Sequence, residues 1–140
     1  MSSRLLNIAL TQYGLKEVAG EENNPEIMKY FKEIGHTWVQ NDETAWCSAF
    51  VNWCAKKAGK EYSGKLNARS WLKVGQEITD PVPGDIVILW REKKDSWKGH
   101  VGFFIRKNEE AVWILGGNQG IGQVNIKPYS LHRVLDYRRI

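Results

Sequence analysis

A cysteine and a histidine are the residues of this chain best suited to nucleophilic catalysis. Cys47 follows a polar run containing Asp42 and Thr44, either of which can cap a helix, and apolar residues then recur at helical spacing. A cysteine in the first turn of a helix is nucleophilic because the positive end of the helix dipole stabilises its thiolate. His100 begins an apolar strand about fifty residues later. The pair predicts an enzyme in which Cys47 attacks a carbonyl carbon and His100 moves the proton.

Both residues also have an ordinary structural interpretation. A free cysteine is most often a small buried hydrophobe, and a strand histidine is often satisfied by a backbone carbonyl. The helix start favours catalysis for Cys47, and the flanking Gly99 and Gly102 leave room for a substrate at His100. We expect a thiolate–imidazolium pair, with the pKa of Cys47 below that of a free thiol. Cys54 lies on the apolar stripe of the same helix and is expected in the core.

The overall composition limits the partners. The chain has 140 residues, a net charge of +4 and a pI near 9.1. Its basic residues are scattered and form no nucleic-acid motif, so we expect no nucleic acid, whereas an anionic cell wall would suit the charge. No apolar run reaches the roughly 18 residues of a membrane span, and no signal peptide is evident. We expect one domain over residues 1–140, a monomer made in the cytoplasm with two free cysteines.

Helical patterns fill the first half of the chain and strand patterns the second. Helices are expected at residues 5–13, 25–34, 47–58 and 68–74, each followed by a glycine. Strands are expected at 85–90, 100–106, 111–115, 123–126 and 134–138. The short link at 108–110 is hairpin-like, which indicates antiparallel pairing. The order predicts an α+β domain, with N-terminal helices packed on one face of a C-terminal antiparallel β-sheet.

Five short segments, in order, resemble one family. They are residues 46–52 (WCSAFVN), 68–72 (ARSWL), 83–87 (PGDIV), 99–103 (GHVGF) and 115–119 (LGGNQ). With them the chain resembles the CHAP domain, the cysteine, histidine-dependent amidohydrolase/peptidase family, and within it the short phage-associated members. The resemblance extends from about Asn24 to the C-terminus. It implies a papain-like fold and the hydrolysis of amide bonds in peptidoglycan.

The resemblance also implies roles for individual residues. By position, Cys47 is the nucleophile, His100 is the base, and Asn118 is the third polar residue, which orients the histidine. Gln119 is an alternative orienter or a substrate contact, and Asn118 has an alternative as a turn residue that tolerates a left-handed backbone. Many relatives carry an acidic residue where this chain has Gly116. The third catalytic position is therefore the one at which the chain departs from the family.

Two further expectations concern the surroundings of the nucleophile. Trp46 is the candidate for a groove wall that stacks on a sugar or packs on a peptide. Calcium-binding relatives carry an aspartate-rich loop just before the cysteine, whereas residues 40–43 (QNDE) hold too few carboxylates at the right spacing. We therefore expect no bound metal and no cofactor.

The implied function is that of a peptidoglycan hydrolase, either a muramoyl-alanine amidase or a peptide endopeptidase. It would act on the wall, in the periplasm or outside the cell, as a phage lysin released by a holin or as an antibacterial effector injected by a secretion machine. An effector would have an immunity protein as a further partner. Two alternatives stay open, a papain-like hydrolase of a non-wall amide and a non-catalytic wall-binding module. Intact Cys47, His100 and Asn118 count against the second alternative.

Overall fold

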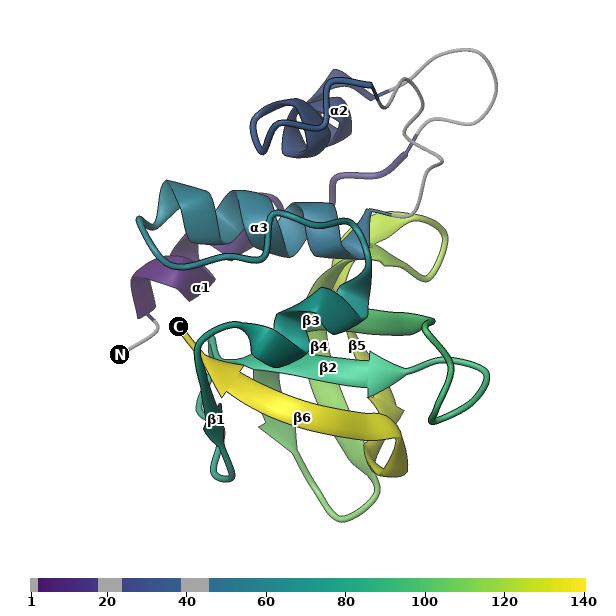
Figure 1. Cartoon of the computed structure of the whole chain (residues 1–140). Helices are drawn as coiled ribbons and strands as arrows, with labels where there is room; N and C mark the ends of the chain where they lie inside the picture. Colours follow the sequence, from purple (N-terminus) through teal and green to yellow (C-terminus); the bar gives the residue numbers. More distant parts are fainter. Residues whose placement is uncertain (1–2, 18–23, 39–45) are drawn as a thin grey trace.

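Three helices precede a sheet in this fold (Figure 1). The computed structural model describes residues 3–17, 24–38 and 46–140. The helices are α1 (Ser3–Leu10), α2 (Pro25–Lys32) and α3 (Cys47–Lys57), followed by a 3-10 helix, η1 (Ala68–Lys73). The strands are β1 (Gln76–Ile78), β2 (Ile86–Trp90), β3 (Gly99–Lys107), β4 (Ala111–Gln119), β5 (Gln123–Ser130) and β6 (Val134–Arg139), with a second 3-10 helix, η2 (Leu131–Arg133), before β6.

All six strands form one antiparallel sheet. Their order is β1-β6-β2-β3-β4-β5, so β3 and β4 are neighbours and β5 lies at an edge. Asn108 accepts hydrogen bonds from the backbone N–H groups of Glu110 and Ala111 at 2.9 and 2.8 Å, which closes the expected hairpin between β3 and β4. The predicted α+β architecture is confirmed. β1 was not expected from the sequence, because three residues are too few to show a strand period.

The helices cover one face of the sheet. α3 packs against β3 and β4, and α1 and α2 pack on α3 (Figure 1). Phe50 of α3 meets Phe103 of β3 edge to face, with 6.1 Å between ring centroids, and Tyr30 of α2 meets Phe50 at 5.3 Å. These buried aromatic contacts hold the first turn of α3 beside β3 and β4.

The opposite face of the sheet has its own apolar cluster. It consists of Val87, Leu89, Phe104, Val112 and Ile114. Because side chains alternate along a strand, β2 places Ile86 and Ile88 under the helices and Val87 and Leu89 in this second cluster. Burial on both faces makes the central strands a rigid support for residues at their ends.

Candidate active site

Cys47 is the first residue of α3. Trp46, the residue before the helix, makes no side-chain capping bond, so the first N–H groups of α3 are not occupied by their own N-cap. The Cys47 side chain is 7 % exposed and lies in a cavity of about 210 Å³. Asp42 and Thr44, the caps expected from the sequence, lie outside the described residues. The structure therefore places the sulfur at a helix start and within reach of a small pocket.

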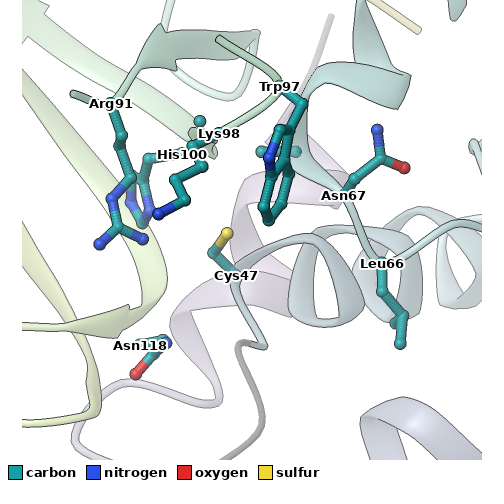
Figure 2. Close-up of a pocket in the computed structure, with 10 residues that line it drawn as sticks. Cys47, Leu66, Asn67, Arg91, Trp97, Lys98, His100 and Asn118 are labelled. Carbon is teal, nitrogen blue, oxygen red and sulfur yellow. The ribbon is translucent and has the colours of Figure 1, made fainter. Parts of the chain in front are cut away.

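His100 is the second residue of β3 and shares that pocket. Its side chain is 6 % exposed, and it lines the cavity together with Cys47, Asn118, Arg91 and other residues (Figure 2). The Cys47 sulfur points into the cavity (Figure 2). Among the described residues no hydrogen bond joins this sulfur to the His100 ring. The structure thus brings three of the sequence-predicted residues to one pocket.

Gln119 is the hydrogen-bonding partner of the histidine. Its Oε1 lies 2.8 Å from His100 Nε2. Its amide Nε2 donates to the backbone oxygens of Ile114 at 3.1 Å and Asn125 at 2.8 Å. Because backbone oxygens can only accept hydrogen bonds, the amide nitrogen must face them and Oε1 must face the histidine. Since Oε1 also can only accept, His100 Nε2 must carry the hydrogen. The neutral ring then keeps its lone pair on Nδ1.

Gly116 leaves the space that Gln119 fills. A Cβ at position 116 would lie 2.5 Å from Gln119 Oε1 and 3.3 Å from His100 Nε2. The pairing of β4 with β5 shifts register between Gly116 and Gln119, and this bulge allows the side chain of residue 119 to face the ring. The amide of Gln119 therefore occupies the place toward which a side chain at position 116 would point.

Asn118 was expected to orient the histidine, but among the described residues it forms no hydrogen bond with the His100 ring. Within the described part of the chain, the hydrogen-bonding partners of His100 Nε2 are Gln119 and, at 3.3 Å, the hydroxyl of Tyr129. Asn118 has φ +59, a left-handed conformation that asparagine tolerates, and it lies in the bulge of β4. The geometry fits the turn interpretation of Asn118 and gives the contact with His100 to Gln119.

Trp46 is also placed differently from the expectation. Its side chain is fully buried, stacked on Tyr30 with 6.0 Å between ring centroids, and its Nε1 donates to the Glu17 carboxylate at 3.2 Å. A buried ring in these contacts cannot form a groove wall. The tryptophan that lines the pocket is Trp97, which is 73 % exposed and stands opposite His100 across the cavity mouth, on the side of Leu66 (Figure 2).

Arg69 holds the loop that carries Trp97. Its guanidinium donates to the backbone oxygens of Lys98 at 2.9 Å, Lys94 at 2.8 Å and Lys93 at 3.0 Å. Arginine suits this position because its planar fork presents several donors at fixed angles. One side chain of η1 thereby sets the conformation of residues 91–98.

Two buried polar residues of α3 hold the wall beside Leu66. Ser48 donates to the backbone oxygen of Lys65 at 2.7 Å, and Asn52 donates to the same oxygen at 2.9 Å. Asn52 also accepts from the N–H of Gly64 at 2.9 Å. Because all three bonds satisfy buried groups, they attach the segment before η1 to the helix that carries the nucleophile.

Burial determines the protonation of the central pair. It raises the pKa of the Cys47 thiol, although backbone hydrogen bonds from Val101 and Ser48 favour the thiolate. It also lowers the pKa of His100 to about 4, against the opposing hydrogen bond to Gln119. Burial therefore opposes the expected thiolate–imidazolium pair and favours a neutral thiol beside a neutral imidazole.

A group of cations at the site was not predicted from the sequence. A second cavity of about 320 Å³ adjoins the first, and its wall includes Arg91, Lys127 and Arg133 besides His100. The three cations come from the residue that follows β2, from β5 and from η2. No local pattern could reveal them, because residues on separate elements are adjacent only after the sheet has formed.

Metal ligands are not grouped in the described part of the chain. No set of three or more His, Cys, Asp or Glu side chains there could hold a metal ion. Asp42 and Glu43, considered in the sequence analysis, lie outside the described residues. In the same described ranges, none of the helices combines the length and the apolar character needed to cross a bilayer.

A helix-start cysteine and a strand histidine with an amide partner, on this α+β fold, are the arrangement typical of papain-like hydrolases. The model of the CHAP domain matches residues 32–118, which is more than half of the chain. The protein therefore belongs to the CHAP family, a family of cysteine amidohydrolases and peptidases related to peptidoglycan.

Solved structures agree with this fold. NlpC1 from Trichomonas vaginalis superposes with a TM-score of 0.58 at 18 % identity, covering 99 % of this chain and 43 % of that protein. An NLP/P60-family protein similar to a lipoprotein, from Staphylococcus aureus subsp. aureus Mu50, gives a TM-score of 0.54 at 18 % identity, covering 99 % and 40 %. The chain thus spans less than half the length of either protein. A search of curated proteins finds no match.

Proposed function

We propose that this CHAP domain hydrolyses an amide bond of peptidoglycan, as a muramoyl-alanine amidase or a peptide endopeptidase. The observation that carries the proposal is the shared pocket of Cys47 and His100, with Gln119 holding the hydrogen on His100 Nε2. The lone pair of Nδ1 is then available as a base. A binding module would have no use for a nucleophile and a base with a determined tautomer.

The proposed reaction starts from the neutral pair. As substrate enters, the proton of the Cys47 thiol passes to Nδ1 of His100, and the sulfur attacks the carbonyl carbon. The backbone N–H of Cys47, at the start of α3, donates to the developing oxyanion. His100 returns the proton to the leaving amine, which departs and leaves a thioester. Water, deprotonated by the same histidine, hydrolyses the thioester and regenerates the thiol.

Digestion of purified peptidoglycan tests this function. Mass spectrometry of the products should show new ends at one type of amide bond, which also distinguishes an amidase from an endopeptidase. Cys47→Ala and His100→Ala should abolish the new ends, because they remove the nucleophile and the base. Cys54→Ala is the matched control, since Cys54 is a fully buried free thiol of the same helix, and it should stay active. Unchanged digestion by Cys47→Ala would refute the mechanism.

We further propose that the enzyme acts on the wall as a phage lysin or as an injected antibacterial effector. Attraction of its net charge of +4 to an anionic wall supports this setting. Production in bacteria with an added export signal should cause lysis, whereas cytoplasmic production should not, and exported Cys47→Ala is the control. Lysis from the cytoplasm without export or a holin would argue for a different substrate.

A further inference from the structure

The cavity beyond His100 differs chemically from the pocket of Cys47. Both share His100, Arg91 and Asn118, so they adjoin along the histidine. The Cys47 pocket has apolar walls at Leu66 and Trp97, whereas the second cavity is lined almost entirely by polar side chains. A substrate whose scissile amide lies at Cys47 would reach the second cavity with a neighbouring group. That cavity is therefore a candidate specificity site.

Three positive charges converge on this cavity. Arg91 stands on the wall it shares with the Cys47 pocket (Figure 2), and Lys127 and Arg133 line the remainder. None of them takes part in an ion pair with another described residue. Each of the three lowers the pKa of His100, which shows that their charges reach the ring. Like charges held together repel one another, and a bound anion relieves that repulsion.

The cations are positioned by contacts of their own. Arg133 Nε donates to the backbone oxygen of Trp90 at 3.0 Å, and the guanidinium lies 5.7 Å from the centre of the Tyr129 ring. Lys127 Nζ lies 5.5 Å from the same ring. One aromatic side chain therefore supports two cations, and the remaining guanidinium nitrogens of Arg133 keep their donors for a ligand.

Tyr129 adds a neutral donor to the same wall. Its hydroxyl oxygen lies 3.3 Å from His100 Nε2, and its ring is tilted against the imidazole at 5.1 Å. Because Nε2 already carries the hydrogen bonded to Gln119, it cannot accept the hydroxyl proton. The O–H of Tyr129 is left to donate to a group inside the cavity.

We propose that this cavity binds a carboxylate of the peptide substrate, on the residue next to the scissile amide, through Lys127, Arg133 and Arg91. This proposal rests on the proposed function, because it takes the substrate to be a peptide amide. A carboxylate is favoured because guanidinium and ammonium groups line a cavity beside the base, and both groups form charge-assisted hydrogen bonds with carboxylates. The cavity would thus select substrates whose carboxylate is free over those in which it is amidated.

A substrate pair tests the selection. Once mass spectrometry has identified the bond, two synthetic peptides are made that differ only in a free or an amidated carboxylate beside it. In Lys127→Gln/Arg133→Gln, kcat/KM for the free-carboxylate peptide should fall roughly 10- to 100-fold, mainly through KM, because charge-assisted hydrogen bonds are lost. For the amidated peptide kcat/KM should change less than about twofold.

Lys32→Gln/Lys73→Gln is the control, since it removes the same charge at two exposed positions away from the site. It should leave both peptides unaffected. Lys127→Gln alone keeps the hydrogen bond between Arg133 and the Trp90 carbonyl. We therefore expect a smaller loss of kcat/KM, confined to the free-carboxylate peptide. Equal losses on both peptides, or no loss on either, would overturn the proposal. So would a loss seen only on walls that carry phosphate polymers, because the anion would then be phosphate.

A binding experiment separates this proposal from the proposed function. If the wild type releases no new ends from any peptidoglycan, the proposed function has failed. The cavity is then tested in Cys47→Ala by titrating N-acetylglutamate and N-acetylglutamine while the ring protons of His100 are followed by NMR. A carboxylate site predicts shifts with the acid only, and their loss when Lys127 and Arg133 are also neutralised. The same response to acid and amide, or to neither, would refute the site.

Discussion

The side chain of His100 is a neutral base because burial lowers its pKa, although the hydrogen bond to Gln119 raises it. Gln119 holds the hydrogen on Nε2, and burial lowers the pKa to about 4, so the ring is a base at neutral pH. Gln119 acts on the reaction through the histidine and touches no reacting atom in the proposed mechanism. It is a positioning residue.

Substituting Gln119 should therefore reduce turnover more than binding. Gln119→Ala removes the acceptor that selects the Nε2–H tautomer, so kcat should fall by at least about tenfold while KM changes little. Asn118→Ala should cost no more than a few-fold in kcat, since Asn118 does not contact the ring. Steady-state kinetics on the identified peptide measures both.

Rescue distinguishes positioning from a structural effect. Gly116→Asp in the Gln119→Ala background should restore part of kcat, because a side chain at 116 points at His100 Nε2 once Oε1 is absent. The same change in the wild type should be harmful, since its Cβ would lie 2.5 Å from Gln119 Oε1. A wild-type rate in Gln119→Ala, with a large loss in Asn118→Ala, would return the role to Asn118.

We expect the Cys47 thiol to be protonated at neutral pH and to react only as it loses its proton. Burial raises its pKa, so iodoacetamide alkylation should have a midpoint above the roughly 8.5 of free cysteine. Measuring the alkylation rate from pH 5 to pH 10 in Cys54→Ala assigns the reaction to one thiol. A midpoint below neutrality would show that the ion pair expected from the sequence forms in solution.

Two elements position the chemistry and a third shapes the pocket. α3 supplies the sulfur at its N-terminus, and β3 supplies the histidine, with α3 packed directly on that strand. The loop between β2 and β3 supplies Trp97 and depends on Arg69 of η1 for three backbone hydrogen bonds. The loop can therefore be loosened without changing the catalytic pair.

Arg69→Ala should have that effect. Losing three charge-assisted hydrogen bonds should free residues 91–98, raise KM several-fold and accelerate trypsin cleavage at Lys93 and Lys94. The alkylation rate of Cys47 should stay unchanged. Arg69→Lys is the matched variant, because lysine keeps the charge but cannot bond to three carbonyls at once. It should be cleaved by trypsin almost as fast as Arg69→Ala. If both variants resist trypsin as well as the wild type does, the loop is held by other contacts.

At the scale of the whole molecule, the site depends on the order of the sheet. β2, β3, β4 and β5 are consecutive in space, so residues from their ends and from the adjoining loops surround His100. Folding also removes His100 from water, and this connects the site to global stability.

Stability should therefore fall as the pH drops from about 6.5 towards 4. The folded pKa of His100 lies at about 4, below its ordinary 6.5, so the unfolded chain takes up the proton first and is favoured by acid. Above pH 6.5 this proton uptake costs no stability. Acidification through pH 4 lowers the free energy of unfolding by on the order of 3 kcal/mol. Urea unfolding at pH 7 and pH 4 should show a smaller pH dependence in His100→Gln than in the wild type. Equal pH dependence would contradict the shift.

Chelation should leave activity intact. Peptidoglycan digestion with EDTA should match the untreated rate, since the proposed mechanism uses no metal and the described residues group no ligand set. EDTA-treated protein with added calcium is the control. Loss with EDTA and recovery with calcium would place a metal in the mechanism.

The sequence alone determined the fold class and singled out Cys47 and His100 as the proposed reacting pair. The apolar period is local, so the helix that begins near Cys47 and the strand at His100 could be read directly. The five ordered segments indicated the CHAP family, which the match over residues 32–118 confirms.

Only the tertiary structure decided which side chains complete the site. The bulge in β4 presents Gln119 rather than Asn118 to His100, and a register shift of this kind has no local signature. Trp46 is buried while Trp97 lines the pocket, because burial depends on what packs against each ring. The pKa values follow from burial, and the cations of the second cavity come from separate elements. Such features arise from contacts between distant residues, which form only when the chain has folded.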